Sequence, residues 1–178
     1  MNDITIRDAV MEDAEGLLKI YSYYVKNTAI SMEYEAPDQE VFMGRMRDIM
    51  KKYPYIIAEK DGRIIGYAHA RAFVERTAYD TSCETTIYLD HEAVKCGLGR
   101  RLYEELERRL RDMGILNLYA CISYVDPEDE YVNNNSRDFH KHMGFTQIAA
   151  YHRCCRKFDR WYDVIWMEKM IGEHKDGV

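Results

Sequence analysis

The residues best suited to chemistry gather at one glycine turn. They are Val94-Lys95-Cys96-Gly97-Leu98-Gly99-Arg100-Arg101. A β-branched and aromatic run at 85–89 precedes the turn, and leucines at helical spacing follow it, which predicts a strand, a turn and a helix. A helix that begins at glycine leaves its first backbone N–H groups unpaired, and its dipole adds partial positive charge there. With Lys95, Arg100 and Arg101 nearby, the turn indicates an anion site, as for a phosphate.

This sequence lacks residues that two known phosphate-binding loops require, and their absence narrows the choice of anion. Leu102 stands where the dinucleotide fingerprint G-x-G-x-x-G needs its third glycine, so an NAD site is disfavoured. The sequence also has no G-x-x-x-x-G-K-[ST] loop for a nucleoside triphosphate. A pyrophosphate on another carrier remains, and coenzyme A is the obvious one. The alternative is a tight turn that only leads into a helix.

Composition favours a single globular domain. The chain has 178 residues, of which 47% are hydrophobic and 31% charged. A formal net charge of −6 argues against a general nucleic-acid binder. No apolar run is long enough to cross a bilayer, and the N-terminus at Met1 lacks the basic and apolar parts of a signal peptide. We therefore expect a cytoplasmic protein with neither nucleic-acid nor membrane partners.

Cysteine and histidine spacing predicts no disulfide framework and no metal site. The five cysteines are an odd number, and Cys154 and Cys155 are adjacent, which makes a disulfide between them awkward. Reduced thiols are the expectation. His140 and His142 lack the further ligands that would complete a tetrahedral site.

Hydrophobic periodicity predicts the elements that position the turn. Helices are expected at 14–25, 38–50, 98–113 and 136–143, and strands at 4–7, 55–59, 64–68, 85–89, 115–122, 148–151 and 164–167. Asp61-Gly62 predicts a hairpin turn, and Ser136 is the expected cap of the last helix. The order β-α-α-β-β-β-α-β-α-β-β predicts an α+β sheet covered by helices in one domain, residues 1–171, with a frayed tail at 172–178.

Four further stretches accompany the glycine turn. They are Arg76-Thr77-Ala78-Tyr79-Asp80, Glu84-Thr85-Thr86-Ile87-Tyr88-Leu89, Asn133 with Ser136 and His140, and Trp161-Tyr162-Asp163-Val164. Together with the turn they resemble the GNAT superfamily of acetyl-CoA-dependent N-acetyltransferases, in its phosphinothricin acetyltransferase-like branch. The superfamily writes its pyrophosphate loop [Q/R]-x-x-G-x-[G/A], and Val94 departs from the expected Gln or Arg. The resemblance implies a single-domain GNAT-like fold with a central mixed, mostly antiparallel twisted sheet and helices on both faces.

The same resemblance implies acetyl-CoA as donor and a small-molecule primary amine as acceptor, with a homodimer as the expected assembly. Backbone groups of Ile87, Tyr88 and Leu89 would pair with the pantetheine arm. Asn133 would contact the cofactor, with Asn134 and Asn135 as alternatives. The pyrophosphate would be cradled by Lys95, Cys96, Gly97, Leu98, Gly99 and Arg100.

The chemistry of amine acetylation points to two catalytic residues. An amine attacks a thioester only when neutral, so the site needs a proton acceptor, and the family match assigns this role to Glu84. The alternative is a solvated carboxylate or one paired with Arg76. His140 is the candidate acid for the departing thiolate. Cys96 is rejected as a nucleophile because direct attack needs no covalent enzyme intermediate.

Acceptor recognition is predicted at Tyr34, Arg76, Tyr79 and Trp161. Arg76 could pair with a substrate carboxylate, which would suit an amino acid or a similar amine. It could equally form a surface ion pair of little consequence. Two other functions stay open: a catalytically silent acyl-CoA-binding module and a peptide N-terminal acetyltransferase.

Overall fold

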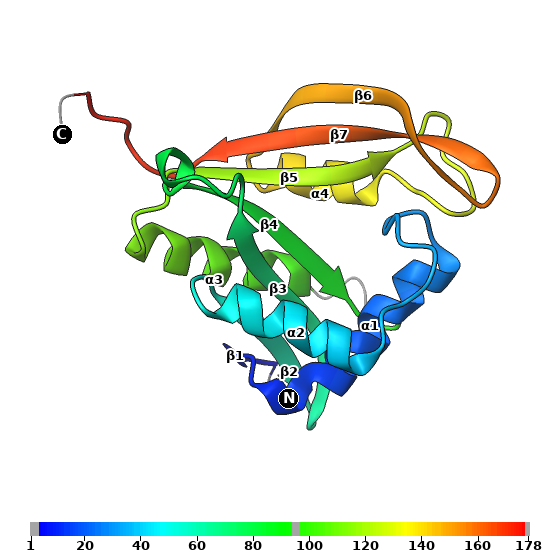
Figure 1. Cartoon of the computed structure of the whole chain (residues 1–178), viewed down its shortest axis with the longest axis horizontal. Helices are drawn as coiled ribbons and strands as arrows, with labels where there is room; N and C mark the ends of the chain where they lie inside the picture. Colours follow the sequence, from blue (N-terminus) through cyan, green and yellow to red (C-terminus); the bar gives the residue numbers. More distant parts are fainter. Residues whose placement is uncertain (1–3, 94–96, 177–178) are drawn as a thin grey trace.

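The computed structural model describes residues 4–93 and 97–176 as one seven-stranded sheet in the order β1-β2-β3-β4-β5-β7-β6 (Figure 1). The strands are β1 (Thr5–Asp8), β2 (Tyr55–Lys60), β3 (Arg63–Ala72), β4 (Ser82–Leu89), β5 (Asn117–Tyr124), β6 (Thr146–Lys157) and β7 (Arg160–Met170). Neighbouring strands are antiparallel except β4 and β5, which are parallel. The predicted mixed, mostly antiparallel sheet is confirmed.

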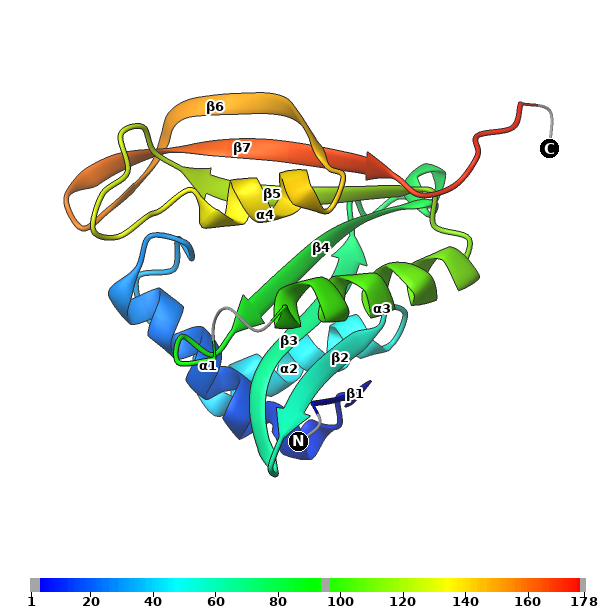
Figure 2. The ribbon, with the colours of Figure 1, turned by 180° about the vertical axis from the view of Figure 1, so that it is seen from behind.

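Four α-helices cover the two faces of this sheet in the part of the chain that the structure describes. They are α1 (Ala14–Asn27), α2 (Gln39–Met50), α3 (Leu98–Asp112) and α4 (Asn135–His142). The short 3₁₀ helices η1 (Met11–Asp13) and η2 (Thr77–Tyr79) lie elsewhere, η1 between β1 and α1 and η2 between β3 and β4. Helices α1 and α2 lie on one face, and α3 lies on the other, in front of the sheet when it is seen from behind (Figure 2). None of these helices is long and apolar enough to cross a membrane.

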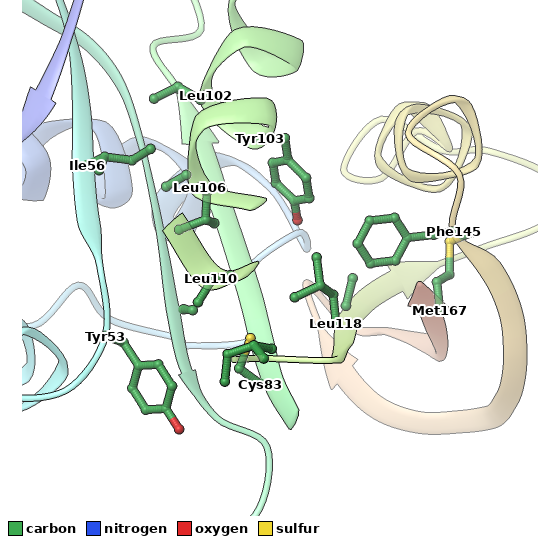
Figure 3. Packing of buried hydrophobic residues seen from close by; sticks show 14 of the residues in the cluster. Tyr53, Ile56, Cys83, Leu102, Tyr103, Leu106, Leu110, Leu118, Phe145 and Met167 are labelled. Carbon is green, nitrogen blue, oxygen red and sulfur yellow. The ribbon is translucent and has the colours of Figure 1, made fainter. Parts of the chain in front are cut away.

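Strand alternation divides the core between these two layers. In β2, Tyr55 and Ile57 pack into the cluster that α1 and α2 form, whereas Ile56 and Ala58 pack toward α3. Figure 3 shows Leu102, Leu106 and Leu110 of α3 over the sheet, next to Ile56. Burying both faces of the central strands fixes the register, since a slip of one residue would exchange the two layers.

Several predicted boundaries are corrected by the structure. Asn134 precedes α4 as its N-cap residue, and Ser136 lies inside the helix, so the predicted Ser136 cap is wrong. Strands β6 and β7 are much longer than the strands predicted at 148–151 and 164–167, because only a turn at Phe158 and Asp159, both with positive φ, separates them. The hairpin turn at Asp61-Gly62 is confirmed, with both residues at positive φ.

The sheet opens between β4 and β5. These strands pair only where Ser82, Cys83 and Glu84 lie beside 117–119. Beyond Glu84, β4 continues to Leu89 with β3 as its partner, and β5 continues to Tyr124 with β7 as its partner. Figure 1 shows the two strands separating toward α1. The facing edges of β4 and β5 are therefore left without a strand partner.

Candidate active site

A cavity of about 1030 Å³ occupies the opening between β4 and β5. Its walls come from β3, β4, β5, α2, α4 and the 28–38 connection between α1 and α2, with Tyr21 of α1 and Tyr103 of α3. The residues that matter below are Glu33, Arg45, His69, Arg71, Glu84, Thr85, Ile87, Tyr88, Tyr103, Asn133 and His140. This volume is in the range of small-molecule and cofactor sites.

Glu84 lies at the point where the strands part. It is the last residue of β4 that pairs with β5, and it is 8% exposed. Arg71 lies directly opposite on β3, and its Nη2 donates to both carboxylate oxygens, at 2.8 and 2.9 Å. The sequence alternative of a pair with Arg76 is wrong, since register places Arg71 there instead. The structure thus holds a paired carboxylate at the cavity wall.

His140 is buried, with both ring nitrogens hydrogen bonded. Nδ1 lies 2.7 Å from the Ser136 carbonyl oxygen, and Nε2 lies 2.7 Å from the Tyr103 hydroxyl. A carbonyl only accepts, so Nδ1 carries the proton and the Tyr103 hydroxyl donates to Nε2. Thr85 Oγ1 extends the network, 3.0 Å from the Tyr103 oxygen. Figure 3 shows Tyr103 reaching from α3 toward the side of the sheet that carries Leu118.

Burial lowers the pKa of His140 to about 4. The folded-state pKa is thus below the value of about 6.5 for an unfolded chain, so the unfolded state binds more protons between these values. The neutral His140 ring therefore contributes fully to the free energy of unfolding above pH 6.5, and this contribution is lost as the pH falls toward 4. When the pH is lowered from 7 to 5, the free energy of unfolding of the wild type should fall by about 2 kcal/mol more than that of His140→Gln.

Urea unfolding at the two pH values measures this difference. His142→Gln is the matched control, because His142 is exposed on the same helix and its variant should keep the wild-type pH dependence. Equal losses in His140→Gln and the wild type would contradict the prediction.

The start of α3 has the form expected for an anion site. Gly97, at φ +71°, is the N-cap residue, a conformation that glycine adopts readily. The N–H groups of Leu98, Gly99 and Arg100 have no acceptor among the described residues, and the first helical bond is donated by the Arg101 N–H to the Gly97 carbonyl. These N–H groups can donate hydrogen bonds to a phosphate.

Other expected phosphate contacts are less direct. The Arg100 side chain pairs with Glu104 at 2.7 Å. At Gly99, an added Cβ would come within 3.2 Å of the Phe139 ring, so glycine permits α3 and α4 to approach closely. Lys95 and Cys96 lie outside the described residues.

The remaining cofactor candidates lie along the same opening. Ile87, Tyr88 and Asn133 line the cavity. Leu89 is absent from the wall, and its carbonyl accepts a 2.6 Å bond from the Tyr24 hydroxyl. Asn134 turns inward, and its Nδ2 donates to the Val125 carbonyl.

None of the four predicted acceptor-binding residues lines the cavity. Tyr34 is 71% exposed, and its hydroxyl donates to the Arg156 carbonyl. Arg76 is exposed at the start of η2, Tyr79 packs against Phe73, and Trp161 is 51% exposed on β7. Of the predicted site residues, the structure brings Glu84, His140, Ile87, Tyr88 and Asn133 together at the cavity and leaves these four outside its wall.

Sequence reasoning missed three residues around the site. Arg71 lies beyond the end of the strand predicted at 64–68, and neither Tyr103 nor Lys157 is among the predicted site residues. The register of β3 against β4 would have revealed Arg71, but that register depends on strand ends that the sequence did not define. Lys157 had no recognisable signal at all.

Comparison with known proteins identifies the family. The model of the acetyltransferase (GNAT) domain matches residues 6–166. The chain belongs to the GNAT acetyltransferase family. It is an acyltransferase with acetyl-CoA as donor, and the predicted family, fold and cofactor are confirmed.

Individual relatives lie in the expected branch of the GNAT family. A phosphinothricin N-acetyltransferase of Streptomyces viridochromogenes is 26% identical over 90% of this chain and 84% of its own. An L-methionine sulfoximine/L-methionine sulfone acetyltransferase of Salmonella typhimurium is 27% identical over 96% of both chains. The crystal structure of a phosphinothricin acetyltransferase from Sinorhizobium meliloti in complex with acetyl-CoA superposes with a TM-score of 0.87, at 31% identity, covering 98% of this chain and 95% of that one.

This GNAT chain has backbone groups without hydrogen-bond partners at two places that suit the two parts of acetyl-CoA. The edge of β4 beyond Glu84 faces the cavity without a strand partner, and the N–H groups at the start of α3 lack an acceptor among the described residues. An extended amide-bearing arm can pair with the first, and a pyrophosphate with the second.

Proposed function

We propose that this enzyme acetylates the primary amine of a small amino acid or a closely similar molecule. The observation that carries the proposal is the position of Glu84, a buried carboxylate in the cavity wall at the point where β4 and β5 part. The names of the relatives support the same class of acceptor, since they include enzymes named for phosphinothricin and for methionine sulfoximine.

In the proposed reaction the neutral acceptor amine attacks the thioester carbon of acetyl-CoA directly. The amide C–N bond forms as the C–S bond breaks, and the proton that the attacking nitrogen loses passes to the departing thiolate, which leaves as free CoA. Acetyl-CoA supplies the acetyl group as a thioester. Glu84 accepts the proton that the ammonium form of the acceptor must lose, and Arg71 holds the carboxylate in place through two hydrogen bonds. The acceptor amine lies in the cavity, against the open edge of β4.

For His140 the hydrogen bonds support a positioning role. A neutral ring that is bonded through both nitrogens has no free N–H to give to a thiolate. Its bond to Tyr103 instead fixes a hydroxyl in the cavity wall. This arrangement fits the predicted role of His140 as a general acid less well than a role in orienting Tyr103.

The test is release of free CoA from acetyl-CoA over a panel of acceptors. The panel contains L-amino acids, phosphinothricin, L-methionine sulfone, simple alkylamines and short peptides, each with a control lacking acceptor. Acceptor-dependent release with free amino acids supports the proposal. Release with peptides alone would favour the peptide N-terminal acetyltransferase. Acetyl-CoA binding without release from any acceptor would favour the silent binding module.

The expected assembly and compartment remain part of the proposal. The 12-residue strand β6 forms one edge of the sheet and exposes Ile148 and Tyr151, which gives a homodimer a surface to use. Light scattering during size-exclusion chromatography measures the mass.

The cytoplasm stays the expected compartment, because free acetyl-CoA is an intracellular metabolite.

A further inference from the structure

We propose that Arg71 is the specificity-determining residue for the acceptor, binding its carboxylate through the guanidinium N–H groups that Glu84 does not use. This inference rests on the proposed function and deepens it, because it restricts the acceptor to α-amino acids. It also moves carboxylate recognition away from Arg76, which lies outside the cavity wall.

The hydrogen bonds of Arg71 leave part of its guanidinium free. Only Nη2 is used, and it donates to both oxygens of Glu84. Nε and Nη1 have no partner in residues 4–93 or 97–176. The side chain is 58% exposed and belongs to the cavity wall. A guanidinium presents five N–H donors in a fixed plane, which allows it to bind two carboxylates at once.

The other basic side chains of the wall do not reach Glu84. Among the described residues that line the cavity, Arg45, Lys52 and Arg71 carry a positive charge. Arg45 pairs with Glu33 at 2.6 Å, and Lys52 pairs with Asp80 at 2.7 Å. Burial lowers the pKa of His69 to about 3, so its ring adds no charge at neutral pH. Arg71 is thus the cation of the wall that lies beside the proposed base.

The geometry of an α-amino acid matches this arrangement. Its amine and carboxylate are attached to one carbon, and the guanidinium nitrogens of Arg71 are attached to one carbon as well. A carboxylate bound at Nη1, the nitrogen beside Nη2, would lie next to the Glu84 carboxylate, and its α-amine would be within reach of Glu84. An amine separated from its carboxylate by a longer chain would lie away from Glu84, and a carboxamide would lose the charge-assisted bonds.

The test compares kcat/KM for L-methionine sulfone and for its primary carboxamide. We expect the wild type to prefer the acid by about 10- to 100-fold, the range that hydrogen bonds to a charged group provide. In Arg71→Lys, which keeps a positive charge near Glu84 but lacks a planar set of donors to share between two carboxylates, the preference should fall to within about threefold of unity. Each kcat/KM is expressed per concentration of neutral amine, which removes the effect of the lower amine pKa of the carboxamide.

Arg45→Lys is the matched control, since Arg45 also lines the cavity and pairs with a glutamate. It should keep the wild-type preference. The inference is overturned if the wild type shows no preference for the acid, if Arg71→Lys retains it, or if Arg76→Lys removes it instead. It is also overturned if simple alkylamines are acetylated and no α-amino acid is. Absence of CoA release from every acceptor contradicts the proposed function itself, which keeps the two failures distinct.

Discussion

Replacing Glu84 by glutamine is expected to lower kcat by about 10²- to 10⁴-fold, the usual contribution of a general base. Glutamine has the same shape and can still accept a hydrogen bond from Arg71, but it cannot take up the proton of the acceptor. The Kd for acetyl-CoA should stay within about twofold, because the expected donor contacts lie on the strand edge and at the start of α3. Stopped-flow and steady-state assays of CoA release measure kcat, and calorimetry measures the Kd.

Glu75→Gln is the control for this substitution. Glu75 also lines the cavity but is exposed, and no described residue pairs with its carboxylate. The control should retain kcat within about threefold, which separates proton acceptance from the loss of one negative charge in the cavity. A Glu84→Gln enzyme with near-normal kcat would mean that water or another group accepts the proton.

The helices and strands were predictable where burial of one face gives the sequence a regular spacing of hydrophobic residues. The leucines of α3 recur at helical spacing because one stripe covers the sheet, and the pattern gave the helix almost to its last residue. Strand β6 offered no such pattern, since most of its residues are exposed on the sheet edge. The turn between β6 and β7 was hidden as well, because Phe158 and Asp159 adopt positive φ without a glycine.

The candidate site was predictable in part, for a related reason. Glu84, His140 and the glycine turn lie in local stretches whose order could be read along the chain. The contact between Arg71 and Glu84 depends on the register of two strands joined by a long polar loop, which spacing alone cannot fix. Tyr34, Arg76, Tyr79 and Trp161 were chosen by residue type from segments near the site, and type does not determine whether a side chain points inward.

A buried lysine, Lys157, is the clearest case of a residue that no sequence pattern indicated. Its side chain is 2% exposed, and its Nζ donates to the carbonyls of Val25, Thr28 and Ser31, at 2.7, 2.8 and 2.7 Å. These carbonyls belong to the end of α1 and the start of the 28–38 connection, while Lys157 ends β6. One ammonium group therefore ties the β6-β7 hairpin to the segment that forms part of the cavity wall.

Lys157→Met should lower the unfolding free energy by about 3 kcal/mol, because three carbonyls lose a charged donor in a place that water does not reach easily. Burial of an ammonium is itself costly and lowers the pKa of Lys157, which offsets part of the loss. Urea unfolding measures the change. The KM for the acceptor should also rise, since Ser31 and Glu33 of the tethered segment line the cavity, whereas the Kd for acetyl-CoA should not change.

Lys26→Met provides the comparison that isolates the buried contacts. Lys26 is exposed, is adjacent to Val25 in α1, and should change the unfolding free energy by no more than about 0.5 kcal/mol when replaced. If Lys157→Met were as stable as Lys26→Met, the three carbonyls would have to be satisfied without the ammonium group. If it were destabilised with an unchanged acceptor KM, the lysine would support the fold without shaping the acceptor side of the cavity. A loss of stability together with a raised KM is the combination that the geometry predicts, because the same carbonyls anchor the hairpin and the wall.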